Sequence, residues 1–273
     1  MVSRIYDRIA EHYDEDWSGL YARARAHCIS QIVSQSGALD GAPDIVDLGI
    51  GTGTALRDLQ QRIPLGYCTG FDVSRGMLSQ AAQNLNGKVN LIHDDATRAA
   101  SYLQAESQDL ALCHFLLDFA DVDPVLDTVQ TLLRPGGFFS LATSTQQSLS
   151  EVHRIHYPRS SRLIGIQRAV GKSNTPINHR QCLERLEKSG FEIVAEKLQR
   201  QPVCFESFID VRCWALDSGW AASFLDDSLG IRKFCNRAAF IIADMLIPSF
   251  YPFDATSEIS IVLARKRSPT TSR

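Results

Sequence analysis

Short apolar runs alternate with amphipathic stretches between residues 44 and 142, and this alternation constrains the fold more than any other feature. Short apolar runs between turn residues are typical of buried strands, and apolar side chains at helical spacing indicate helices packed against them. The expected strands are Asp44–Leu48, Cys68–Val73, Val89–His93, Leu110–Phe115 and Phe138–Ala142. The expected helices are Thr54–Arg62, Arg75–Asn84, Thr97–Gln104 and Pro124–Leu133. Strands and helices in this order predict βαβ crossovers and a parallel sheet.

The segments outside this alternation are interpreted as parts of the same domain. Residues 1–36 have apolar side chains at helical spacing and predict an N-terminal helical cap. The alternation is interrupted at 143–175 and again at 205–253, which we interpret as two insertions, the second one helical. It resumes with a helix at His179–Ser189 and with strands at Phe191–Ala195 and Glu258–Ala264. The length suits one large α/β domain, so we expect residues 1–273 to form a single domain.

Composition and charge argue against several classes of protein. The formal net charge is −3 and like charges form no long block, whereas a protein that binds nucleic acid usually carries a basic surface. The 7 cysteines are far apart and form no Cys-x-x-Cys pair, so we expect them to be reduced and not to hold a metal. No stretch approaches the ~20 apolar residues that span a bilayer, and the N-terminus has no apolar signal core. We therefore expect a cytoplasmic protein without a nucleic-acid partner or stable membrane insertion.

A glycine-rich loop follows the first expected strand and opens the next helix. It has the pattern Gly-x-Gly-x-Gly from Gly49 and Gly51 onward, and Asp47 precedes it by two residues. Glycines at this place allow backbone N–H groups to approach a ligand, although a plain turn has the same pattern. The dinucleotide fingerprint Gly-x-Gly-x-x-Gly needs a glycine at position 54 or 56, where this chain has Thr54 and Leu56. An acidic residue before the loop favours a cationic end of a ligand over a pyrophosphate.

Three further features follow the glycine loop in order along the chain, and a fourth precedes it. Asp72 ends the second strand, about 20 residues after the loop. An acidic residue at this position accepts hydrogen bonds from ribose hydroxyls in nicotinamide enzymes as well, so Asp72 alone does not identify the ligand. Asp95 and Ala96 end the third strand, and Arg134-Pro135-Gly136-Gly137 precedes the fifth. The first helix contains Tyr6-Asp7-Arg8-Ile9-Ala10-Glu11-His12-Tyr13-Asp14. Together with the glycine loop, this set resembles the motifs of class I, Rossmann-like methyltransferases of the small-molecule type, which depend on S-adenosylmethionine.

The resemblance implies the fold, the cofactor and its contacts. The fold would be a seven-stranded, mostly parallel sheet with helices on both faces and a reversed last strand, and the cofactor would be S-adenosyl-L-methionine. Glycines 49 and 51 would face the methionine part, Asp47 would order the loop, and Asp72 would hold the ribose. Asp95 and Ala96 would read the adenine edge. The implied cofactor-binding residues are Tyr13, Asp47, Gly49, Gly51, Asp72, Val73, Met77, Asp95 and Ala96. Met77 would pack on the adenine and Tyr13 would cap the carboxylate of the methionine part. The alternatives are that Met77 is a core residue of its helix and that Tyr13 packs its helix onto the sheet.

Three histidines are candidates for catalysis. Methyl transfer from a sulfonium is an in-line displacement to which an enzyme contributes mainly alignment, and a hydroxyl or thiol acceptor also needs a base. His114 ends the fourth strand, beside the expected position of the methyl group, although it could equally bond to the backbone. His153 and His156 lie in the first insertion, where substrate is often covered. Their His-x-x-His spacing lacks an accompanying carboxylate pair, so we expect no metal site.

The second insertion is rich in tryptophan, phenylalanine, isoleucine and leucine. Such a segment is typical of a lid over an apolar ligand and equally of a homodimer interface.

The fourth strand also lacks the Asn/Asp-Pro-Pro-Tyr/Phe segment of DNA-adenine methyltransferases. We therefore expect methyl transfer to a small apolar or aromatic metabolite, with a hydroxyl acceptor slightly favoured over nitrogen or carbon. Two other hypotheses are a methyltransferase-like protein that binds the cofactor for another reaction or for partner binding, and an NAD-dependent oxidoreductase.

Overall fold

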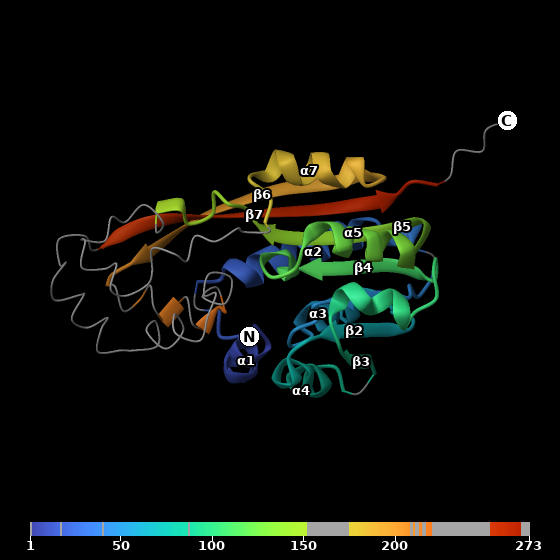
Figure 1. Cartoon of the computed structure of the whole chain (residues 1–273), viewed down its shortest axis with the longest axis horizontal. Helices are drawn as coiled ribbons and strands as arrows, with labels where there is room; N and C mark the ends of the chain where they lie inside the picture. Colours follow the sequence, from blue (N-terminus) through green and yellow to red (C-terminus); the bar gives the residue numbers. More distant parts are fainter. Residues whose placement is uncertain are drawn as a thin grey trace.

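A central sheet of seven strands organises the chain (Figure 1). The computed structural model describes residues 2–16, 18–39, 41–86, 88–151, 175–207 and 252–268, together with residues 210, 213, 214 and 217–219. The strands are β1 (Ile45–Leu48), β2 (Cys68–Asp72), β3 (Asn90–His93), β4 (Gln108–His114), β5 (Leu133–Ser144), β6 (Phe191–Phe205) and β7 (Phe253–Lys266). Their order is β3-β2-β1-β4-β5-β7-β6, and β7 runs antiparallel to both of its neighbours. This arrangement confirms the predicted mostly parallel sheet with a reversed last strand.

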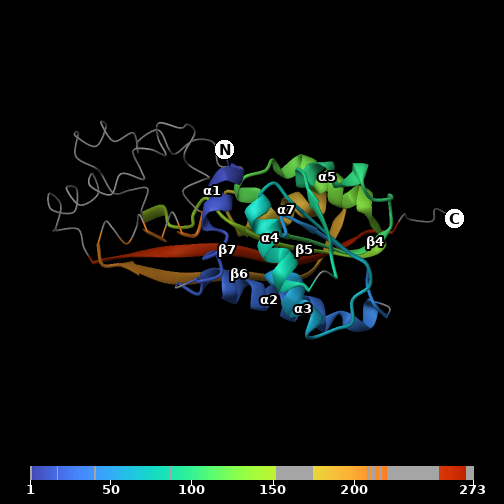
Figure 2. The same cartoon turned by 90° about the horizontal axis from the view of Figure 1, so that it is seen from below.

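Helices cover both faces of the sheet. They are α1 (Val2–Ile9), α2 (Leu20–Ser34), α3 (Thr54–Gln60), α4 (Arg75–Asn84), α5 (Val122–Leu132) and α7 (His179–Lys188), with short 3-10 turns η1 (Ser36–Ala38), η2 (Ala96–Ser101) and η3 (Leu116–Asp118). Figure 2 shows α2 and α3 on one side of the strands and α5 on the other. The two faces have separate apolar cores, one formed with α2, α3 and α4 and one with η2, α5 and α7. The strands between them are buried on both faces, which explains their continuous apolar runs.

The N-terminal segment, predicted to be helical over residues 1–36, contains two separate helices. Helix α1 ends at Ile9 and α2 begins at Leu20, with turns between them. The break follows from Asp16, whose Oδ2 accepts hydrogen bonds from the backbone N of Tyr21 at 2.8 Å and of Ala22 at 2.9 Å. A carboxylate that satisfies the first free N–H groups of a helix fixes where that helix begins. The predicted helix Thr97–Gln104 is likewise the shorter 3-10 turn η2.

Strands β6 and β7 are much longer than the predicted Phe191–Ala195 and Glu258–Ala264. They pair from Phe191 and Lys266 to Phe205 and Phe253, whereas the pairing of β5 with β7 ends at Ser144 and Ile259. The two strands therefore continue past the rest of the sheet as an antiparallel ribbon (Figure 1). Residues 152–174 and most of 208–251 lie outside the described parts of the chain, so the predictions for the two insertions remain predictions. No helix in the described ranges is long and apolar enough to cross a membrane.

Candidate active site

The glycine loop after β1 has a backbone conformation that favours glycine at three positions. Gly49, Gly51 and Gly53 have φ values of 79°, 54° and 76°, in the left-handed region that favours glycine. A Cβ on Gly53 would lie 2.7 Å from Leu85 Cδ1, so this glycine allows the loop to pack on α4. A Cβ on Gly51 would meet no heavy atom within 4 Å. Gly53 therefore serves packing, and Gly51 borders the open space that a ligand could fill.

Asp72, at the end of β2, ties two loops together. Its Oδ2 accepts a hydrogen bond from Gly51 N at 2.9 Å, and its Oδ1 accepts one from Ser74 N at 2.8 Å. Burial raises the pKa of this carboxyl, although the two backbone bonds oppose the shift. The side chain lies at the edge of a cavity and each of its oxygens keeps a further lone pair. Asp72 thus combines a structural role with an exposed acceptor for ligand hydroxyl groups.

Asp47, in β1, is a buried carboxyl with an unsatisfied oxygen. The residue is 2% exposed, and its Oδ2 has no hydrogen-bond partner among the described residues. Burial raises its pKa to about 8, and the charge of Asp72 adds to the shift. A buried acceptor without a partner costs roughly 1–3 kcal/mol, so its retention requires an explanation. A ligand that brings a cationic donor to this position would satisfy it.

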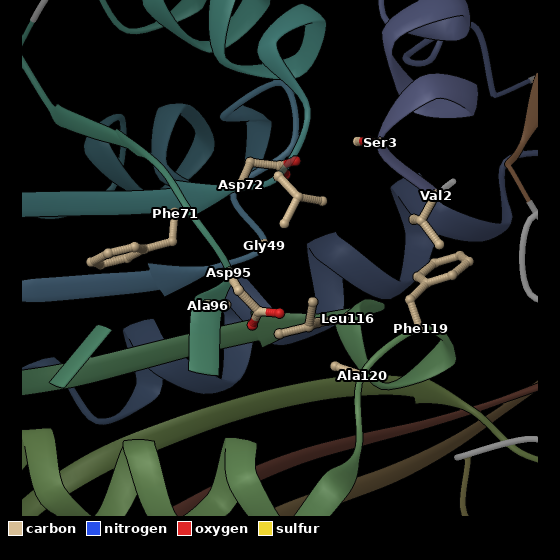
Figure 3. A pocket seen from close by; sticks show the side chains of 11 residues that line it. Val2, Ser3, Gly49, Phe71, Asp72, Asp95, Ala96, Leu116, Phe119 and Ala120 are labelled. Atoms are coloured by element: carbon tan, nitrogen blue, oxygen red, sulfur yellow. The ribbon is translucent and has the colours of Figure 1, made fainter. Parts of the chain in front are cut away.

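The first of three neighbouring cavities, which we call the strand-end cavity, lies at the carboxyl ends of the strands and has a volume of about 390 Å³. Its lining residues are Val2, Ser3, Gly49, Phe71, Asp72, Val73, Asp95, Ala96, Leu116, Phe119 and Ala120. Figure 3 shows the carboxylates of Asp72 and Asp95 at one side and Val2 and Phe119 at the other. An apolar slot with two carboxylates suits a flat base that carries donor groups.

The second, the glycine-loop pocket, has a volume of about 70 Å³ and also borders Gly49. Its lining residues are Tyr13, Tyr21, Arg25, Asp47, Gly49, Ile50, Gly51, Thr52, Thr54, Ala55, His114 and Phe115. His114 Nε2 is 3.0 Å from Ser140 Oγ, and burial lowers its pKa to about 4. His114 is therefore neutral at physiological pH and a weak base.

The third, the outer cavity, has a volume of about 450 Å³. Its lining residues are His12, Tyr13, Glu15, Asp16, Tyr21, Trp214, Asp217 and Ser218. It shares Tyr13 and Tyr21 with the glycine-loop pocket, which in turn shares Gly49 with the strand-end cavity. The three cavities are thus successive neighbours, with two tyrosines between the second and the third.

The structure brings most of the predicted site residues together. Tyr13, Asp47, Gly49 and Gly51 line the glycine-loop pocket, and Asp72, Val73, Asp95 and Ala96 line the strand-end cavity. Met77 is 1% exposed within α4 and lines none of the three cavities. His153 and His156 lie outside the described residues. No group of three or more histidine, cysteine, aspartate or glutamate side chains in the described ranges could hold a metal ion.

Asp118, at the end of η3, was not among the sequence candidates. Its Oδ2 accepts a hydrogen bond from Ser144 Oγ at 3.3 Å, and its Oδ1 is buried without a partner in the described part of the chain. Burial raises its pKa to about 7. Burial also raises the pKa of Tyr13 and Tyr21, and the charge of Asp118 adds to both shifts. The sequence feature that could have identified Asp118 as a candidate is its position as a lone acidic residue in the apolar stretch directly after the fourth strand.

Comparison with known proteins agrees with this geometry. Residues 45–137 match the family described as "Methyltransferase domain". The chain is 29% identical over 159 residues to the biotin biosynthesis bifunctional protein BioCD of Bordetella avium, covering 57% of this chain and 32% of that protein. It is 27% identical over 160 residues to the malonyl-[acyl-carrier protein] O-methyltransferase of Alcanivorax borkumensis, covering 56% and 50%. The matched region thus spans half or less of the length of these relatives.

A solved structure shows the same fold. The S-adenosylmethionine-dependent methyltransferase from Thiobacillus denitrificans, in complex with S-adenosyl-L-homocysteine, superposes with a TM-score of 0.51 at 16% identity, covering 88% of this chain and 91% of that one. The strand order is that of the class I, Rossmann-like methyltransferase fold. The glycine loop and Asp72 lie within the region that matches the methyltransferase domain.

Proposed function

We propose that this chain transfers the methyl group of S-adenosylmethionine to a small apolar or aromatic metabolite, with a hydroxyl acceptor favoured over nitrogen or carbon. The observation that carries the proposal is the succession of three cavities. The strand-end cavity suits the adenosine part and the glycine-loop pocket suits the methionine part. The outer cavity, beyond Tyr13 and Tyr21, suits the acceptor. Donor and acceptor would thus meet beside these tyrosines.

The residues present fit the cofactor at both ends. Asp72 would accept the ribose hydroxyls, and Asp95 would accept the adenine amino group. The open space over Gly51 and the unsatisfied Oδ2 of Asp47 suit the methionine backbone and its ammonium group. Arg25 lines the same pocket, where its guanidinium, held by Asp58 at 2.7 Å, would pair with the methionine carboxylate.

The outer cavity supports a neutral acceptor with an apolar body. Tyr13, Tyr21 and Trp214 supply aromatic surface, and the carboxylates of Glu15, Asp16 and Asp217 also line the cavity. Carboxylates around a cavity disfavour an anionic ligand by like-charge repulsion. A phenol or another neutral hydroxyl compound is compatible with this lining.

We further propose that Asp118 takes the proton of the acceptor hydroxyl. When bound, S-adenosylmethionine supplies a methyl group on a positively charged sulfur; the residues of this chain align the acceptor, exclude water and remove its proton. A base works best when its pKa lies near the working pH, as it does for Asp118 at about 7 but not for His114 at about 4. Asp118 itself lines none of the three cavities, but its charge acts on Tyr13 and Tyr21 of the outer cavity, so it would draw the acceptor proton through one of these hydroxyls. His114, which lines the glycine-loop pocket, stays a predicted catalytic or contact residue.

Calorimetric titration with S-adenosylmethionine, S-adenosylhomocysteine and NADH tests the cofactor. A screen of matched phenols, anilines and benzoates, read out as S-adenosylhomocysteine formed, then tests the acceptor. We expect binding of the two adenosyl ligands only, and methylation of phenols ahead of anilines with no turnover of benzoates. Binding of NADH alone would refute the proposal. Cofactor binding without any product from an extended acceptor panel would favour a different reaction or a binding role.

A further inference from the structure

Helix α1 forms one wall of the strand-end cavity. Val2 and Ser3 line it, and Figure 3 places them across the cavity from Asp95. The ring of Tyr6 packs edge-on against Phe119, with centroids 5.4 Å apart, and Phe119 lines the same cavity. This wall of the cavity therefore comes from the N-terminal segment and not from the sheet.

Asp7 anchors α1 to the start of α4. Its Oδ1 accepts a hydrogen bond from Ser74 Oγ at 2.7 Å and another from Gly76 N at 2.9 Å. The bond from Gly76 and then that from Ser74 lower the pKa of Asp7, so its carboxylate is charged throughout the neutral range. Ser74 in turn caps α4 by accepting a hydrogen bond from Met77 N at 3.1 Å. A negative charge next to the first turn of a helix is also favoured by the helix dipole.

The anchor depends on a close backbone approach at Gly76. A Cβ at this position would lie 2.9 Å from Asp7 Cα and 3.0 Å from Asp7 O. Any larger residue would therefore push α1 away from α4, and the hydrogen bond from Gly76 N would lengthen or break. The contact thus requires a carboxylate on α1 and a glycine on α4 together.

A second anchor holds the turn that follows α1. Thr52 Oγ1, in the glycine loop, donates a hydrogen bond to Asp14 Oδ1 at 3.0 Å. Asn84 Nδ2 of α4 donates to Thr52 O at 2.9 Å, which ties the same loop to the same helix. Asp7 and Asp14 therefore fasten the N-terminal segment to the loops after β2 and β1, the two loops that border the cofactor cavities.

We propose that Asp7 is a positioning residue that holds α1 closed over the adenosine part of the cofactor and so sets how long the cofactor stays bound. The inference rests on the proposed function, because it takes S-adenosylhomocysteine as the ligand. Release through this wall requires α1 to leave α4, which breaks both hydrogen bonds of Asp7. Entry through the same wall requires the same opening, so loss of the anchor should speed dissociation and should not slow association.

The test is the dissociation rate of S-adenosylhomocysteine, measured by competitive displacement in a stopped-flow instrument with the full chain. We expect Asp7→Ala to release the ligand about tenfold faster and to bind it at least as fast as the wild type. Asp7→Asn keeps an acceptor oxygen and should recover part of the loss. Glu11→Ala, which removes an exposed carboxylate from the turn just after α1, should behave as the wild type. Gly76→Ala should act in the same direction as Asp7→Ala.

A merely structural role of Asp7 would give a different pattern. It would lower the melting temperature of the ligand-free chain and slow association without a specific effect on release. A double-mutant cycle of Asp7→Ala with Ser74→Ala should show strong non-additivity in the dissociation rate, because both changes remove the same bond. Release at the wild-type rate from Asp7→Ala, or additive effects in the cycle, would overturn the inference while leaving the proposed function intact. Failure of the wild type to bind S-adenosylhomocysteine would instead overturn the proposed function and this inference with it.

Discussion

The strand-end cavity and the outer cavity are built in different ways. The strand-end cavity is lined mainly by residues at the ends of adjacent strands, such as Gly49, Asp72 and Asp95, whose relative positions are set by the sheet register. The outer cavity is lined by residues of the turn before α2, by Tyr21, and by Trp214, Asp217 and Ser218, which follow β6 in the sequence. Under the proposed function, a cofactor site fixed by the sheet beside an acceptor site built from loops would allow the acceptor to change without disturbing the cofactor.

The largest expected effect separates the two regions directly. Asp72→Ala removes the acceptor for the ribose hydroxyls and also the bonds from Gly51 N and Ser74 N, so the glycine loop loses its fixed position. We expect S-adenosylhomocysteine affinity to fall by roughly 100-fold or more in calorimetric titration. Asp127→Ala, which removes an exposed carboxylate of α5, is the control and should bind as the wild type. Unchanged affinity in Asp72→Ala would show that the cavity does not hold the ribose.

Asp118→Asn should affect the acceptor side alone. The amide cannot take a proton, so we expect the rate of methyl transfer to a hydroxyl acceptor to fall roughly 100-fold with cofactor affinity unchanged. Because the pKa of Asp118 is raised to about 7, the wild-type rate should rise with pH through that value, and the variant should lose this rise. His114→Asn is the matched comparison, and its rate should fall less than about tenfold. A larger loss in His114→Asn would return the role of base to the histidine.

Two glycines of one loop should respond differently to the same change. Both Gly51→Ala and Gly53→Ala place a side chain in the left-handed region, at about 1–2 kcal/mol each. Gly53→Ala also brings Cβ against Leu85, so its main effect should be a melting temperature lower by roughly 6 °C. Gly51→Ala meets no protein atom and should instead weaken S-adenosylhomocysteine binding about tenfold. Equal losses of binding and stability in both variants would contradict the assignment of Gly51 to the ligand.

The smallest expected effect concerns stability and pH. Burial raises the pKa of Asp47 to about 8 and of Asp118 to about 7, whereas both titrate near 4 in an unfolded chain. Between these values the folded chain binds more protons than the unfolded chain, so the free energy of unfolding decreases as pH rises through this window. Urea titrations of the ligand-free protein should therefore give a lower midpoint at about pH 8.5 than at about pH 5.5. Asp118→Asn should reduce the difference in urea midpoint between the two pH values. An unchanged difference would show that the carboxyl of Asp118 is exposed to solvent and that its pKa is not raised.

Local sequence patterns were enough to predict the parallel sheet and most of the residues that line the strand-end cavity and the glycine-loop pocket. The glycine loop, Asp72, Asp95 and Ala96 each belong to one continuous strand–turn–helix unit, so short-range periodicity and turn chemistry were sufficient to locate them. The tertiary structure added the role of each group. It showed that Gly51 borders open space while Gly53 serves packing, and it buried Met77 within α4 away from all three cavities.

The outer cavity and the position of α1 became visible only in the folded chain. Four features depend on contacts between residues that are distant in the sequence or that a periodic pattern does not show. They are the break between α1 and α2, the length of β6 and β7, the burial of Asp118 and the hydrogen bond from Ser74 to Asp7. Periodicity records which face of an element is apolar, but it carries no information about which distant residue will stand opposite. A carboxyl acquires a raised pKa or an anchoring role from those neighbours, and therefore only once the chain has folded.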